Sequence, residues 1–139
     1  MKHLICLFIS INAVIFSFGQ NPSIDSLQQV LLSYTQLTKK TFSDDTIAVN
    51  NYLAISASYT AAKNDSSFIF SNAALELSEK IHWKVGEAKA ECAIGLHHYR
   101  VTRNYELGIV HFEKSNALWA QITTSEQPIA AQRLWLARC

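Results

Sequence analysis

Helical spacing of apolar positions dominates the chain between residues 45 and 122, and it predicts four helices over residues 46–63, 67–82, 87–102 and 105–122. In the second and fourth of these helices the order aromatic, small, large apolar, small recurs at offsets of three, four and three residues. Offsets of this kind place the four side chains on one helical face. The members of each matching pair are 37 residues apart: Phe68 with Tyr105, Ser71 with Gly108, Leu75 with Phe112, and Ser78 with Ser115.

A fixed period of this size is typical of a helical solenoid, in which each helix pair stacks on the next. The small residues let a neighbouring helix approach closely, and the large residues fill the space on either side. The first helices match less well, with Ile55 against Cys92 and Ala57-Ser58 against Ile94-Gly95. The competing interpretation is an ordinary helical bundle with chance self-similarity.

This pattern resembles the tetratricopeptide repeat family, whose first helix carries Trp, Leu-Gly and Tyr and whose second helix carries Ala, Phe and Ala. The matching residues are, in chain order, Ile94-Gly95, Asn104-Tyr105, Gly108, Phe112 and Ser115. Glu91 departs from the family pattern, because a bulky Trp is usual there, and Gly108 replaces Ala. The turn is one residue longer than the consensus, and the period exceeds the usual length of about 34 residues.

The resemblance covers about residues 45–122 as two degenerate repeats. It implies an all-α fold, a short α-solenoid of antiparallel helix pairs. Residues 23–40 are expected to form an atypical helix that caps the first repeat, as solenoid ends require. We expect a polar turn over residues 42–45, with Asp44 or Asp45 as the next helix cap, and a linker over residues 84–86.

Residues 123–139 are expected to begin a further, incomplete repeat. Pro128 suits the first position of a helix, and apolar residues follow it. No second helix follows to cover this one before Cys139, so the chain is interpreted as the N-terminal piece of a longer protein or as a truncated product.

Residues 1–19 have the pattern of a secretory signal peptide. Lys2 and His3 form a short basic start, and an apolar stretch over residues 4–18 follows. Ser17 and Gly19 supply the small residues of a cleavage site before Gln20. An uncleaved anchor is the alternative. The chain is therefore expected to be exported, with the periplasm of a Gram-negative envelope as the favoured compartment.

Composition narrows the classes of function. The 139 residues are 49% hydrophobic, which is enough for one core and one domain. Four Gly and two Pro favour helices over a sheet of many strands. Twelve basic and eleven acidic residues give a net charge of +1, and no long run of either sign occurs. The electrostatic pattern of a nucleic-acid-binding protein is therefore missing.

Candidate chemistry is sparse in the sequence. His97, His98 and His111 fall within one predicted helix pair, but His97 and His98 are adjacent and point about 100° apart, so a shared metal is not expected. We expect these histidines on partly exposed faces. Glu87 and Glu91 are expected to form a solvated stripe near the start of their helix, where acidic side chains are favourable. Cys92 is interpreted as a small buried hydrophobic residue. No phosphate loop, nucleophile elbow or paired-carboxylate signature occurs, so neither an enzyme nor a cofactor is expected.

A concave surface remains as the candidate site. Stacked helix pairs leave a groove lined mainly by first helices, in which extended peptides commonly lie. The family resemblance implies a groove formed by Lys89, Leu96, Tyr99 and Arg100 and, one period earlier, by Tyr52, Tyr59 and Lys63. Tyrosines beside basic groups suit an acidic or carboxylate-ended peptide. The alternative is that these residues only face outward.

The expected function is therefore an exported protein- or peptide-interaction module. The resemblance extends to exported sensor regions of envelope signalling proteins, and it implies the sensory or scaffolding N-terminal part of a longer protein such as a histidine kinase. A membrane-anchored continuation after Cys139 would fit that interpretation. The alternative is a free-standing periplasmic scaffold or assembly factor.

Overall fold

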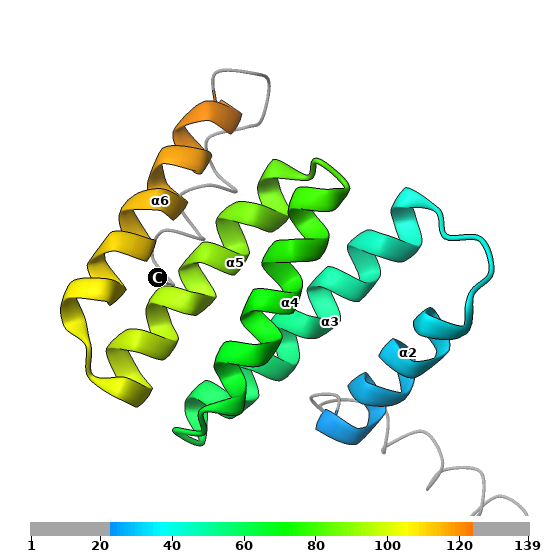
Figure 1. Cartoon of the computed structure of the whole chain (residues 1–139), viewed down its shortest axis with the longest axis horizontal. Coiled ribbons are helices and arrows are strands. Elements are labelled where there is room, and N and C mark those ends of the chain that lie inside the picture. Colours follow the sequence, from blue (N-terminus) through cyan, green and yellow to red (C-terminus); the bar gives the residue numbers. More distant parts are fainter. Residues whose placement is uncertain (1–22, 124–139) are drawn as a thin grey trace, which may run out of the picture.

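A computed structural model describes residues 23–123 of the chain (Figure 1). The described residues form helices and turns, with no strand among them, which confirms the all-α prediction. The elements are α2 (Ile24–Gln36), α3 (Phe42–Ala61), α4 (Ser66–Lys80), α5 (Lys84–His97), the π-helical turn η2 (His98–Thr102) and α6 (Tyr105–Thr123). No helix in this range is both long enough and apolar enough to cross a lipid bilayer. The expected leader over residues 1–19 and the tail after residue 123 lie outside the described residues.

The five α-helices lie side by side in chain order, and each reverses the direction of the one before it (Figure 1). Each helix packs against its predecessor, and α5 also contacts α3. Helix α5 therefore has three helical neighbours, α3, α4 and α6. Its buried residues outnumber those of every other described helix, and they include Glu87 and Glu91. The expectation of a solvated stripe for these two carboxylates is wrong, because α6 covers this side of α5.

The predicted boundaries were wrong at two helix starts. Helix α3 begins at Phe42, so residues 42–45 are its first turn and not a loop. Thr41 is the cap: its side chain accepts a hydrogen bond from the Asp44 amide, and the Asp44 carboxylate accepts one from the Thr41 amide. This reciprocal arrangement satisfies two amides that a helix start leaves unpaired. Helix α5 begins at Lys84, so the expected linker is also helical.

Burial agrees with the 37-residue pattern in the second helices. Ser71 and Gly108 are both buried, as are Ser78 and Ser115. The large apolar pair, Leu75 and Phe112, is half-buried at both sites, and the two aromatic residues that open the pattern are both exposed. Positions one period apart thus meet similar surroundings in α4 and α6.

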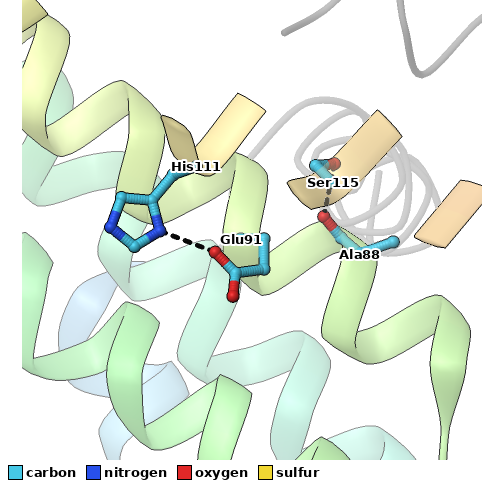
Figure 2. A network of polar contacts seen from close by, with 4 residues as sticks. All are labelled: Ala88, Glu91, His111 and Ser115. Carbon is cyan, nitrogen blue, oxygen red and sulfur yellow. Dashed lines mark hydrogen bonds and ion pairs between the residues drawn. The ribbon is translucent and has the colours of Figure 1, made fainter. Parts of the chain in front are cut away.

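Small residues occupy much of the interior, and their hydroxyls connect neighbouring helices. Ser56 of α3 donates a 2.9 Å hydrogen bond to the Ser67 carbonyl of α4. Ser115 of α6 donates a 2.7 Å hydrogen bond to the Ala88 carbonyl of α5, as Figure 2 shows. Each of these buried hydroxyls is satisfied, and no buried polar side-chain atom in the described part of the chain lacks a partner. Close helix approach therefore leaves no uncompensated polar group there.

Helices α5 and α6 approach closely where Gly95 faces Gly108. A Cβ at Gly95 would lie 2.6 Å from the Phe112 ring and 3.1 Å from the Gly108 carbonyl oxygen. A Cβ at Gly108 would lie 3.3 Å from the Gly95 carbonyl oxygen, which is a milder conflict. Gly95 is therefore required because Phe112 occupies the space that a side chain would need.

Replacing Gly95 by Ala is expected to destabilise the fold. Overpacking against Phe112 costs about 1–3 kcal/mol, and replacing a helical glycine recovers up to about 1 kcal/mol, so the free energy of unfolding should fall by about 1–2 kcal/mol. Urea unfolding followed by circular dichroism measures this change.

Gly108→Ala is the matched control and should cost less. In a Phe112→Leu background, Gly95→Ala should lower the free energy of unfolding by less than it does in the unmodified chain, because leucine frees the space next to Gly95. Equal costs for Gly95→Ala in both backgrounds would contradict the assigned contact.

Candidate functional site

A slot of about 140 Å³ lies between α3 and α5. The side chains that line it come from one face of each helix and from η2; they are Leu53, Ser56, Ala57, Thr60, Lys89, Cys92, Ala93, Leu96 and Arg100. Small side chains line its middle, and the larger ones stand toward its two ends. Its volume is below the roughly 300–1,000 Å³ of typical small-molecule sites. The slot therefore suits one inserted side chain of a longer ligand better than a whole cofactor.

The lining of the slot is apolar with basic groups near its ends. Lys89 and Arg100 supply the two cations, and none of the described lining residues is acidic. Burial lowers the pKa of the Lys89 ammonium. This ammonium lies 3.4 Å from the Asn50 side-chain oxygen and 5.6 Å from the centre of the Trp83 ring. Such a lining favours an anionic or carboxylate-bearing ligand with apolar side chains.

Three of the seven predicted groove residues line the slot: Lys89, Leu96 and Arg100. The other four lie elsewhere. Tyr52 and Tyr59 pack on the α2 side of α3, against Phe70, where the ring centres of Tyr59 and Phe70 are 5.5 Å apart.

The remaining two predicted residues lie at helix ends. Lys63 is in the left-handed turn after α3, with φ of 53°, because α3 ends two residues earlier. Tyr99 belongs to η2 and pairs with Tyr105 at 5.1 Å between ring centres. It is exposed and lies outside the slot lining.

A one-residue difference in register explains the misplaced tyrosines. The paired slot residues of α3 and α5 are 36 residues apart, not 37: Leu53 and Lys89, Ser56 and Cys92, Ala57 and Ala93, Thr60 and Leu96. A shift of one residue rotates a position by about 100° around a helix. Carrying Lys89 and Leu96 back by 37 residues therefore selects Tyr52 and Tyr59, which lie on a different face of α3 from the slot.

The extra residue lies between the slot and α6. Nine positions separate Leu96 from Tyr105, and eight separate Thr60 from Phe68. The longer stretch contains η2, and a π-turn holds one more residue per hydrogen-bonded turn than an α-turn. The α3 residues that line the slot could have been found from the sequence. Their positions, 53, 56, 57 and 60, have the same spacing as the α5 lining residues at 89, 92, 93 and 96.

A second feature, which the sequence analysis missed, is a ring cluster formed by Phe68, His97, His98 and His111. The ring centres of His97 and His98 are 5.2 Å apart, and those of His98 and His111 are 5.4 Å apart and nearly parallel. Phe68 of α4 lies 5.2 Å from His97 and 5.6 Å from His98. The histidines were expected on partly exposed faces, but His97 is 4% exposed. Helix α6 brings His111 back onto η2, which no local pattern predicts.

Hydrogen bonds hold the outer rings of this cluster in place. Ser67 Oγ of α4 lies 2.7 Å from His97 Nδ1, and Glu91 Oε2 lies 2.6 Å from His111 Nδ1 (Figure 2). Burial is the main cause that lowers the pKa of both His97 and His98. The neighbouring His97 and His111 lower the pKa of His98 further, while Asp65 acts in the opposite direction on His97.

No group of three potential ligands is arranged to hold a metal ion within residues 23–123. The rings of His98 and His111 are stacked, whereas the His97 ring meets the His98 ring edge-on. Cys92 is buried, as expected, but it is disulfide-bonded and hence not a free thiol. The described residues contain no other cysteine.

Lowering the pH from about 7.5 to about 5.5 is expected to lower the free energy of unfolding. Histidines of the unfolded chain titrate near 6.5, and the pKa values of His97 and His98 are lower in the fold. The unfolded chain therefore binds protons first as the pH falls, and stability is lost until the folded pKa values are passed. Urea unfolding at several pH values measures the slope.

His98→Asn should reduce this slope. His82→Asn should keep it, because His82 is an exposed residue in a left-handed turn that Asn tolerates. Asp44 does not contribute in this window, since hydrogen bonds from Thr41 lower the pKa of its carboxyl below an already acidic value. Equal or greater stability at the lower pH would contradict the expectation.

Comparison of the chain with models of protein families, with curated proteins and with solved structures finds no match. The chemistry of the slot and of the ring cluster is therefore what points to a function.

Proposed function

We propose that this chain is an exported tetratricopeptide-like module that binds an extended acidic peptide in the slot between α3 and α5. The slot is the observation that carries the proposal: most of its described lining residues are apolar or small, Arg100 stands at one end, and no described lining residue is acidic. Charge complementarity selects a ligand with carboxylates, and the small volume selects one inserted apolar side chain.

The arrangement of the helices supports a repeat. Helix α3 is followed by α4 as α5 is followed by α6, and the two first helices contact each other. Slot positions recur after 36 residues, and second-helix positions recur after 37 with matching burial. In a solenoid, first helices that lie side by side form one continuous concave surface, on which an extended peptide can lie.

The length of the slot sets the length of the ligand. Its lining residues on α5 and η2 run from position 89 to position 100, which corresponds to about 16 Å along a helix. An extended peptide covers this distance with about five residues. A peptide of about ten residues with alternating acidic and apolar side chains therefore spans the slot, brings a carboxylate to Arg100 and places an apolar side chain over Ala57 and Ala93.

In the cell, this module would serve as the sensory or scaffolding part of a longer envelope protein. The pattern over residues 1–19 and the resemblance to exported sensor regions support this role. The coding sequence that follows Cys139 tests it: a hydrophobic span with kinase or DNA-binding signatures favours the sensor. Further repeats favour the alternative of a free-standing scaffold.

Arg100→Ala is expected to weaken the binding of an acidic probe. The probe is a fluorescein-labelled ten-residue peptide of alternating Asp and Leu, and fluorescence anisotropy measures its Kd. Loss of one charge-assisted contact of about 1.4 kcal/mol raises Kd roughly tenfold. Binding of the same peptide with Asn in place of Asp should not respond to this variant.

Two further variants complete the test. Lys114→Ala is the matched control, because it removes an exposed cation from α6, outside the slot lining, and should leave Kd unchanged. Ala57→Trp should block the slot while sparing the core, because Ala57 is an exposed residue of the slot lining. Unchanged binding to Ala57→Trp would rule out the slot as the peptide site.

A further inference from the structure

The ring cluster is connected to the slot by two routes. The first route is Ser67. The Ser67 hydroxyl contacts His97, and the Ser67 carbonyl oxygen accepts a hydrogen bond from the side chain of Ser56, which lines the slot. The other route is η2, which carries both His98 and Arg100. A change in the ring cluster therefore reaches one wall of the slot and one of its two cations.

Groups from four elements meet in the ring cluster. Helix α4 supplies Phe68, and Asp65, the residue just before that helix, acts on His97. Helix α5 supplies His97 and the Glu91 carboxylate, and α6 supplies His111. From η2 comes His98. Among residues 23–123, Glu91 is the one carboxylate bonded to an imidazole of the cluster.

Protonation of a second imidazole would place like charges about 5 Å apart in a largely buried site. His98 has the weakest support, since it lies between two imidazoles and its Nδ1 is 3.5 Å from the Thr102 hydroxyl. Its backbone belongs to a π-turn, whose hydrogen-bond geometry is uncommon and which often occurs at functional sites. Repulsion within the cluster is therefore relieved most readily by movement of η2.

We propose that the ring cluster is a proton-sensitive junction: uptake of a further proton by its imidazoles opens η2, withdraws Arg100 from the slot and releases an acidic peptide. The effect on peptide binding rests on the proposed function, whereas the opening of η2 does not. An exported protein meets external pH directly, and histidine is the side chain that responds in the mildly acidic range.

Amide hydrogen exchange of residues 98–102 tests the junction without any ligand. Between about pH 7.5 and about pH 5.5 the protection factors of these amides are expected to fall about tenfold in the unmodified chain, which corresponds to about 1.4 kcal/mol in the free energy of opening. They should change less than about twofold in His98→Asn, which removes the central imidazole. His82→Asn, which removes an exposed histidine outside the cluster, should behave like the unmodified chain.

Binding of the alternating Asp and Leu peptide tests the consequence. Its Kd should rise about tenfold over the same pH range in the unmodified chain and stay constant in His98→Asn. Both proteins meet the same probe, so titration of its own carboxylates cancels in the comparison. His111→Gln is the second variant if His98→Asn does not fold, because Gln still donates a hydrogen bond to Glu91.

The outcomes separate the two proposals. Unchanged protection at residues 98–102, or an equal loss in His98→Asn, overturns the junction. Tighter peptide binding at the lower pH also overturns it, since that result reports only added positive charge near the slot. Absence of peptide binding at every pH overturns the proposed function, and the exchange measurement still decides whether the junction exists.

Discussion

Close packing of α5 against three helices is the constraint on which the rest of the structure depends. The helices approach closely because the positions between them are small: Gly95 faces Gly108, and Ser56, Ser67 and Ser115 are buried between α3, α4, α5 and α6. Small polar side chains are usable there because their hydroxyls bond to backbone carbonyls or to His97. The interior thus gains close contact without leaving buried polar atoms unpaired.

This packing has two consequences on different sides of α5. Toward α3, small residues on both helices leave the slot, with Lys89 and Arg100 near its ends. Toward α4 and α6, the same close approach brings Phe68, His97, His98 and His111 within ring-stacking distance. Because α5 and η2 are continuous, the slot and the ring cluster share one helical segment, so a displacement of η2 affects both.

The π-turn accommodates a difference of one residue between two sequence periods. First-helix positions recur after 36 residues and second-helix positions after 37, so one extra residue has to be accommodated before α6. In η2 this residue is absorbed inside the helix instead of in the short turn that follows. The cost is a helical turn with poorer hydrogen bonds, and because this turn carries both Arg100 and His98 it is a natural point of movement.

The helices and much of the candidate site could be predicted from local pattern. Apolar spacing gave the all-α fold, and the aromatic, small, large, small order identified positions whose burial matches in α4 and α6. Apolar spacing did not predict the start of α3. The reciprocal hydrogen bonds between Thr41 and Asp44 begin this helix four residues earlier than the spacing indicates. One residue of register also separates the expected groove from the slot: Tyr52 and Tyr59, which the family resemblance assigns to the groove, face α2 and Phe70.

By itself, then, the sequence determined which residues are helical and which of their faces are apolar, because both follow from contacts a few residues apart. Only the tertiary structure decided that Glu91 is buried against His111, that His97 lies beneath Phe68, and that slot residues of α3 and α5 share a 36-residue register. These are contacts between residues 20 to 36 positions apart. Their geometry depends on where each helix begins and on the extra residue in η2, and a change of one residue at either place rotates a side chain by about 100°.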